Sequence, residues 1–345
     1  MQDSSTGPGD TGGRRWVAAD VLTDRITQLL TKKTMFGAEA KMAAQRLVEA
    51  DLGGFAGDGV RRVPALLEAI DLAHIDPRAQ LVVERETAAM CVLDAGKGMG
   101  QVAATKAVQR AIKKAADVGT GTVVVRRSQW MGPPTLYAAL AAREGLIALC
   151  TTNSGSARVV GDGGQVALNT VTTIAWGFPR AEGPALLIDQ PSARGTWEDV
   201  ERAQQAGQTL PECVALDCDG QSTTRPDEAQ SLFPWAGPAG VAAGLVASVL
   251  SGVLAGGRLP VHKQRAAERD GAEHFFYVID PRQFGDADAM QAELEAGMDV
   301  WRDAHSDTEP WRLATESLDG QVALSQTDFD ALAQLAGRLQ VDWPE

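Results

Sequence analysis

A carboxylate between two glycines is the first group in this sequence that could carry chemistry. Asp58 lies in the segment GGFAGDGVRR, with Gly57 and Gly59 on either side and Arg61 and Arg62 close behind. One interpretation is a turn aspartate that caps the segment after it. The other is an active-site carboxylate beside an arginine that holds an anionic substrate. Asp58 is therefore the candidate acid–base residue.

A second turn, SQWMG at residues 128–132, lies where a predicted strand (121–125) passes into a predicted helix (134–144). Such connections often carry catalytic groups. Trp130 at the centre of this turn can neither donate nor accept a proton for chemistry. Its indole can fill space as packing, or it can offer a flat wall to an apolar or cationic group.

The histidines and cysteines of this chain offer no clear catalytic group in place of Trp130. The chain has four histidines, and none lies in a glycine-rich turn. No Ser-His-Asp or Cys-His arrangement and no metal-ligand cluster is visible, and Cys213 and Cys218 have no histidine beside them. We predict no metal site, so proton transfer near pH 7 would depend on carboxylates, Tyr, Lys or water.

Glycines 96, 98 and 100 separate a predicted strand from a predicted helix and could cradle a phosphate. Their spacing is not G-x-G-x-x-G, and no acidic residue ends a second strand at the distance that the dinucleotide-binding motif requires. The pattern favours a tight turn without a ligand.

Charge and composition limit the partners of this chain. It has 345 residues, 44% of them hydrophobic, and a formal net charge of -13, so we expect neither nucleic acid nor a membrane surface as a partner. The polar first residues are not a signal peptide, which predicts a cytoplasmic protein. The apolar stretch at 236–257 is rich in Gly and Ala and predicts a buried, closely packed helix rather than a membrane span.

The alternation of strands and helices predicts an α/β protein. We expect a disordered tail at 1–15, a helical segment at 16–75 beginning with a helix from residue 17, a central α/β domain at 76–285, and a helical segment at 286–345 that packs with the N-terminal one.

Several segments together resemble the malate/L-lactate dehydrogenase family of the type-2, non-Rossmann kind, over residues 17 to 340. Its members include ureidoglycolate, sulfolactate and diketogulonate dehydrogenases and piperideine-carboxylate reductase. The matching segments are LVEADLGGFAGDGVRR, VVVRRSQWMG, GLIALCTTNS, LPECVALDCDGQSTTRPDEA, GPAGVAAGLVASVLSGVL and EHFFYVIDPRQFG. The resemblance implies a sulfolactate-dehydrogenase-like fold, in which a central mixed sheet is joined by a helical domain from both chain ends. It also implies a homodimer with the site near the subunit interface.

The residues that carry the family's chemistry depart from its pattern. Trp130 and Asp58 stand where the family has histidines, Ala239 where it has a lysine, and Glu198 and Asp199 where it has a Gly-Lys pair. The scaffold motifs are kept, which indicates a retained fold with a lost or altered reaction.

Other positions of the family pattern persist. The resemblance implies NAD(P) as the cofactor, and only Asp189 and the hydroxyl of Ser192 remain of its binding segment. Arg62 and Asn153 also persist. The substrate-binding candidates are Arg62, Trp130, Tyr137 and Asn153.

Three hypotheses follow. The first is a repurposed enzyme, a tailoring enzyme of specialised metabolism, that acts on a carbonyl, imine or amino-acid-derived substrate through Asp58. The second is an NAD(P)H-dependent imine or 2-oxo acid reductase without the usual histidine. The third is a non-catalytic binding or regulatory partner. An open pocket with a perturbed carboxylate would favour the first over the third.

Overall fold

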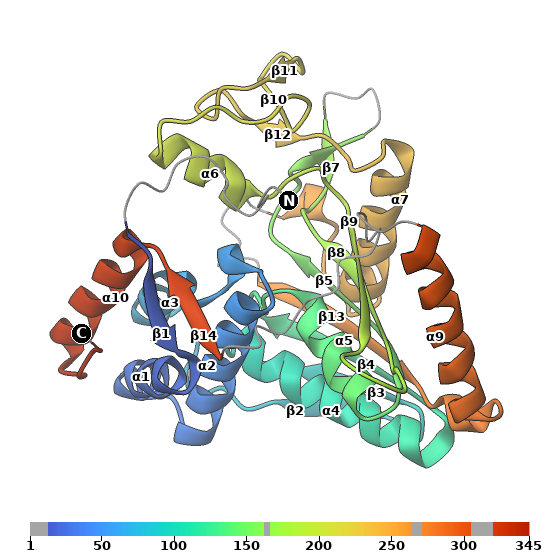
Figure 1. Cartoon of the computed structure of the whole chain (residues 1–345). Helices are drawn as coiled ribbons and strands as arrows, with labels where there is room; N and C mark the ends of the chain where they lie inside the picture. Colours follow the sequence, from blue (N-terminus) through green and yellow to red (C-terminus); the bar gives the residue numbers. More distant parts are fainter. Residues whose placement is uncertain (1–12, 162–165, 264–270, 305–319, 345) are drawn as a thin grey trace.

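A mixed seven-stranded sheet forms the centre of the protein in the computed structural model, which describes residues 13–161, 166–263, 271–304 and 320–344. The strand order is β2-β3-β4-β13-β5-β8-β9 (Figure 1). Only β3 and β4 pair in parallel, and every other neighbouring pair is antiparallel. The predicted mixed-sheet α/β class is confirmed. The strands are β2 Val82–Glu86, β3 Met90–Asp94, β4 Thr120–Ser128, β13 Ala272–Ile279, β5 Ile147–Ser154, β8 Thr173–Phe178 and β9 Leu186–Pro191.

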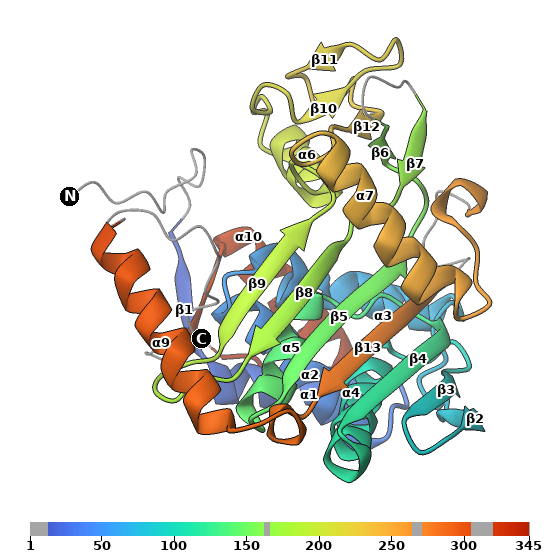
Figure 2. The same ribbon diagram turned by 90° about the vertical axis from the view of Figure 1, so that its right-hand side faces the viewer.

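Helices cover both faces of this sheet. Figure 2 shows α7 (Pro238–Ala247) in front of it, with α4 (Gly100–Val118) and α5 (Pro134–Arg143) behind. Alanine is the commonest residue on the buried face of α4, which lets its backbone lie close to the strands. A Cβ at Gly121 of β4 would lie 2.1 Å from the carbonyl oxygen of Ala111. This close packing requires glycine at position 121.

The prediction of a buried helix at 236–257 is only partly right. Helix α7 continues into a π-helical turn, η3 (Ser248–Val253). The small residues of both lie on the buried side, because a Cβ at Gly252 would collide with Asn153 of β5 and a Cβ at Gly244 would collide with Asn169. The large apolar residues therefore point outward and are exposed, namely Leu245, Val246, Val249, Val253 and Leu254.

The two chain ends share one hydrophobic core. Strand β1 (Arg15–Ala18) pairs antiparallel with β14 (Gln321–Leu324). Residues of α1 (Ala19–Lys32), α2 (Gly37–Leu52), α3 (Val63–Asp71) and α10 (Gln326–Leu339) bury a common cluster. The helix expected from residue 17 begins at Ala19 instead, because residues 15–18 form the strand. The predicted tail lies almost wholly outside the described residues.

A small second sheet stands at one end of the central one (Figure 2). Its strand order is β11-β10-β12-β6-β7, and α6 (Trp197–Gln205) packs on it through Val200 and Ala203. None of these short strands was predicted, because runs of two or three residues carry no readable periodicity. They are β6 Val159–Val160, β7 Ala167–Asn169, β10 Ala215–Leu216, β11 Ser222–Thr223 and β12 Ser231–Leu232.

The remaining elements are η1 Ala56–Asp58, η2 Val60–Arg62, η4 Pro260–His262, η5 Pro281–Gln283 and α9 Ala287–Ala304. Arg180, after β8, forms an ion pair with Glu295 of α9 at 2.7 Å. Within the described residues, no helix is long and apolar enough to cross a membrane.

Candidate functional site

The turn between α2 and α3 holds Asp58 at the edge of the helical segment. The backbone N–H of Asp58 donates to the carbonyl of Phe55 at 2.8 Å, and the two short 3₁₀ turns η1 and η2 follow each other around Gly59. Burial, together with the negative charge of Glu198 and against the positive charge of Arg62, raises the pKa of the Asp58 carboxyl to about 7. A carboxyl with this pKa can both accept and donate a proton near neutral pH.

Arg62 links this turn to Trp130. Its guanidinium carbon lies 4.9 Å from the centre of the indole ring, which is cation–π geometry. Its Nη1 also lies 3.5 Å from Oε1 of Glu198 on α6. Trp130 is partly buried and packs against the core of the helical segment. The indole thus serves both as packing and as a wall that carries a cation on its face.

Close backbone contact fixes the Trp130 turn. A Cβ at Gly100 would lie 2.2 Å from the carbonyl oxygens of Gln129 and Trp130, so only glycine lets the start of α4 approach so closely. Gly132 has φ of 82°, a left-handed conformation that favours glycine. The glycine-rich segment at 96–100 acts here as a turn that abuts the site.

Helix α6 brings two more carboxylates. Its N-terminus has a capping box, in which the Thr196 hydroxyl accepts the Asp199 N–H at 3.1 Å and the Asp199 carboxylate accepts the Thr196 N–H at 2.9 Å. Glu198 faces the Asp58 turn, and a Cβ at Gly57 would lie 3.9 Å from its Cβ. Asp199 and Asp189 also raise the pKa of Asp58 through their charges.

The cluster therefore unites Asp58, Arg62 and Trp130 from the predicted set with Glu198. Asp189, on β9, belongs to the same electrostatic environment. The sequence analysis noted Glu198 only because it stands where the family has a Gly-Lys pair. Nothing in its spacing indicated an ion pair with Arg62.

Tyr137 and Asn153 lie elsewhere. The Tyr137 side chain is fully buried in the core under the central sheet, and its hydroxyl donates to the Met131 carbonyl at 2.6 Å. Asn153 is also fully buried, and its amide donates to Glu273 Oε2 at 2.8 Å and to the Arg258 carbonyl at 2.9 Å. Both side chains hold the scaffold in place, and neither reaches the Asp58 cluster.

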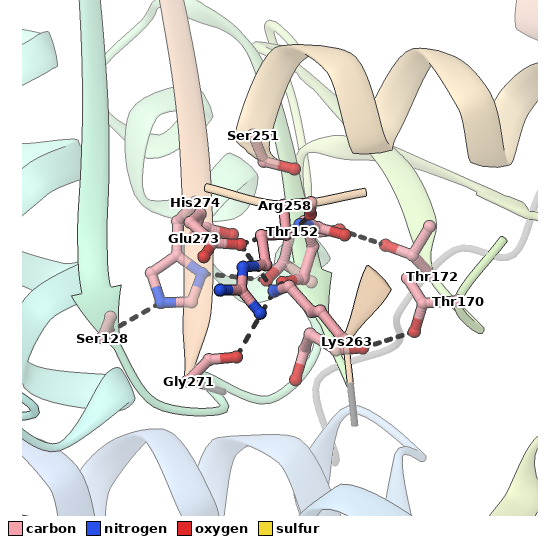
Figure 3. A network of polar contacts seen from close by, with 12 residues as sticks. Ser128, Thr152, Thr170, Thr172, Ser251, Arg258, Lys263, Gly271, Glu273 and His274 are labelled. Carbon is pink, nitrogen blue, oxygen red and sulfur yellow. Dashed lines mark hydrogen bonds and ion pairs between the residues drawn. The ribbon is translucent and has the colours of Figure 1, made fainter. Parts of the chain in front are cut away.

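A buried polar network includes Lys263, Glu273 and His274 (Figure 3). The Lys263 ammonium donates to Glu273 Oε2 at 2.6 Å and to the Asn153 carbonyl at 2.8 Å. His274 lies between Thr152 and Ser128, at 2.9 Å from each hydroxyl. Burial and the charge of Lys263 lower the pKa of His274 to about 3, so it stays neutral near pH 7. The sequence did not predict this network, whose members come from three distant segments.

The tautomer of His274 follows from its partners. The Thr152 hydroxyl donates to the Glu273 carbonyl at 3.1 Å, which leaves its oxygen to accept from the imidazole Nδ1–H. The other nitrogen, Nε2, is then unprotonated and lies 2.9 Å from the Ser128 hydroxyl oxygen, which is also 3.4 Å from the Gln129 carbonyl oxygen. His274 thereby ties β13 to the end of β4, two residues before Trp130.

The residues predicted to bind a dinucleotide do not fit its diphosphate. The Ser192 hydroxyl is buried, accepts the Thr172 N–H at 3.0 Å and donates to the Thr170 carbonyl at 3.1 Å. The capping box already uses donors at the α6 N-terminus, and Glu198 and Asp199 place negative charge there. A diphosphate needs free N–H donors or cations at such a place. No group of residues that could hold a metal occurs in the part of the chain that the structure describes.

Comparison with known proteins identifies the relatives of this chain. A sequence model of the family described as malate/L-lactate dehydrogenase matches residues 17–317. Malate dehydrogenase of Pyrococcus horikoshii is 32% identical over 279 residues, which are 78% of this chain and 77% of that protein. The Delta(1)-pyrroline-2-carboxylate/Delta(1)-piperideine-2-carboxylate reductase of Pseudomonas syringae pv. tomato is 27% identical, over 86% of this chain and 90% of that protein.

A solved structure supports the fold. The crystal structure of malate dehydrogenase from Entamoeba histolytica superimposes with a TM-score of 0.88 at 23% identity, covering 96% of this chain and all of that one. At this identity the superposition shows the fold alone.

Proposed function

Because the chain belongs to the malate/L-lactate dehydrogenase family, we propose that it is a repurposed enzyme of that dehydrogenase and reductase family. Asp58 is its acid–base residue, and its substrate is a carbonyl, an imine or an amino-acid derivative. The observation that carries this proposal is the Asp58 carboxyl, whose pKa is raised to about 7 beside an arginine that lies on an indole face. The resemblance implies that Asp58 and Trp130 of this cluster stand where the family has histidines.

The proposed reaction is proton transfer next to the carbonyl or imine carbon. Ionised Asp58 takes the proton from that neighbouring carbon, so that a C–H bond breaks and an O–H bond forms on the carboxyl. The electron pair of the C–H bond moves into the carbonyl group and gives an enolate, or into a protonated imine and gives an enamine. The proton then returns to the same carbon or to another atom of the substrate. No redox partner is consumed.

Arg62 gives this substrate its orientation. A guanidinium binds a carboxylate through two parallel hydrogen bonds, and the contact of Arg62 with Glu198 at 3.5 Å is longer than a hydrogen bond. An anionic substrate can therefore compete with Glu198 for the guanidinium. The relative from Pseudomonas syringae is named for cyclic imines that carry a carboxylate, and we propose substrates of that kind for this chain. A role as a tailoring enzyme in a biosynthetic pathway is consistent with such substrates.

Deuterium exchange tests this function. Wild-type protein and Asp58→Asn would be incubated in D₂O with a cyclic imine carboxylate or a 2-oxo acid, without any nicotinamide cofactor, and followed by proton NMR. We expect the wild type to accelerate exchange over the protein-free rate, and the variant to lose about 10²-fold or more of that acceleration. Equal exchange with and without protein would contradict the proposal.

A cofactor titration separates this function from a reductase. We expect no saturable binding of NADH or NADPH up to millimolar concentration, because the predicted cofactor residues do not fit a diphosphate. Micromolar binding together with reduction of the imine would replace our proposal with an NAD(P)H-dependent imine reductase. Absence of both exchange and cofactor binding would favour the non-catalytic partner.

We also propose a homodimer. The exposed apolar row on α7 and η3 consists of Leu245, Val246, Val249, Val253 and Leu254. Contiguous large apolar side chains on a surface are typical of an interaction site. The family resemblance favours a second copy of this chain as the partner that covers them.

A further inference from the structure

A second carboxylate, Asp51, lies directly behind the Asp58 turn. It belongs to the last turn of α2, and its Oδ2 accepts the backbone N–H of Val60 at 2.8 Å. A Cβ at Gly59 would lie only 2.1 Å from Asp51 Oδ1. The carboxylate therefore occupies the space that a side chain at position 59 would need.

This contact lies in the middle of the segment that carries the acid–base site. Gly59 and Val60 stand between Asp58 and Arg62, and they end one 3₁₀ turn and begin the next. A bond that holds the backbone at residue 60 limits the movement of both neighbouring functional groups. Among the described residues, no hydrogen bond or ion pair joins Asp51 to Arg62 or to Trp130.

The charges around Asp51 link its protonation to that of Asp58. Burial raises the pKa of Asp51 to about 7, and the Val60 N–H opposes this by stabilising the carboxylate. Asp328 of α10 and Asp58 raise the pKa of Asp51, while Arg61 lowers it. Because the repulsion between two carboxylates is mutual, charge on Asp51 also favours the protonated form of Asp58, with a smaller effect than the charges of Glu198, Asp189 and Asp199.

We propose that Asp51 is a positioning residue of the acid–base site: its bond to the Val60 N–H fixes the turn that carries Asp58 and Arg62, and its charge acts on Asp58 across that turn. This inference rests on the proposed function of Asp58. The charge of Asp51 and its hydrogen bond to Val60 have different consequences, so they can be tested separately. Loss of the charge alone changes the pH at which Asp58 works, and loss of the hydrogen bond changes how well the site is aligned.

Two substitutions distinguish these effects. Asp51→Asn keeps an oxygen that can accept the Val60 N–H but removes the charge, whereas Asp51→Ala removes both. We expect the pH–rate profile of Asp51→Asn to rise at lower pH than that of the wild type. We expect Asp51→Ala to show the same shift and a maximal rate about tenfold below that of Asp51→Asn, since small misplacements of catalytic groups are costly. Asp24→Asn, an exposed carboxylate on α1, is the matched control.

A readout that does not depend on turnover accompanies these rates. With ¹³C-labelled aspartate, the Asp58 carboxyl signal is identified by its loss in Asp58→Asn, and its titration midpoint is compared in the wild type and in Asp51→Asn. A downward shift in Asp51→Asn supports the coupling, even if the wild type catalyses no exchange and the proposed function fails. An unmoved midpoint together with equal rates for Asp51→Asn and Asp51→Ala would overturn the inference, and the result for Asp58→Asn would still stand.

Discussion

The Arg62 guanidinium lies 4.9 Å from the centre of the Trp130 ring, so this indole carries a cation on its face. The two residues come from the α2–α3 turn and the β4–α5 turn, which are far apart in the sequence. The ring orients a guanidinium that would otherwise be mobile, and each such contact contributes about 0.5–1 kcal/mol at an exposed site. Under the proposed function, Arg62 is the group that would bind a substrate anion.

Substitution of Arg62 tests this role. We expect Arg62→Met to raise the KM of an anionic substrate about 10- to 100-fold, because a charged hydrogen bond contributes about 1.5–3 kcal/mol. Arg62→Lys should recover only part of the loss, since an ammonium cannot make the same two-pronged contact. Arg202→Met on α6, which removes an exposed partner of Asp199, is the control. Unchanged KM in Arg62→Met would exclude Arg62 from substrate binding.

The pH dependence of exchange should follow Asp58. Because Asp58 acts as a base and its pKa is about 7, the rate should rise with pH up to about 7 and then level off. Among the nearby negative charges, that of Glu198 raises the pKa of Asp58 most. The pH–rate profile of Glu198→Gln should therefore rise at lower pH than that of the wild type. A profile of Glu198→Gln that coincides with the wild type would show that the charge of Glu198 does not act on Asp58.

Stability should depend on pH in the opposite direction. The pKa of Asp58 is about 7 when folded, against an ordinary value of 3.8. The folded protein therefore binds a proton that the unfolded chain releases, and stability falls as pH rises from about 4 to about 7. Asp58→Asn should match the wild type below pH 4 and exceed its unfolding free energy above pH 7. Thermal melts across this range measure the difference, and a variant less stable at pH 8 would contradict this sign.

Tyr137 is expected to matter for stability and not for the substrate. Tyr137→Phe leaves the Met131 carbonyl without its buried donor, which should cost about 1–3 kcal/mol of unfolding free energy. Its KM should remain that of the wild type. Tyr277→Phe, the other tyrosine of the chain, is the matched control. A raised KM with unchanged stability would return Tyr137 to the substrate site.

The homodimer makes a prediction about mass. The double substitution Leu245→Glu and Val249→Glu places two charges on the exposed face of α7 and η3, and we expect it to convert a dimer into a monomer of 36.4 kDa in light-scattering measurements. Val300→Glu, at a still more exposed apolar position on α9, should leave the dimer intact. A monomeric wild type would exclude the interface.

The sequence by itself determined the family, the α/β class and the long elements. These features depend on periodic patterns and extended motifs, which survive because the same backbone must be packed. The sequence also singled out Asp58, Arg62 and Trp130, because each stands in a glycine-rich or strand-to-helix turn. It could not place α7 correctly, since the same Gly and Ala residues that suggested burial on all sides allow one face to approach the sheet and leave the other outside.

Only the tertiary structure decided which of these residues act together. Glu198 of α6 meets Arg62 of the α2–α3 turn, and Asp51 packs against Gly59, but no spacing along the chain encodes either contact. Burial is likewise a property of the folded chain, so the raised pKa of Asp58 and the neutral state of His274 depend on neighbours from distant segments. For Tyr137 and Asn153, the tertiary structure gives a different result from the sequence. Their residue types are suited to binding, but in the folded chain they lie in the core and hydrogen-bond to buried backbone groups.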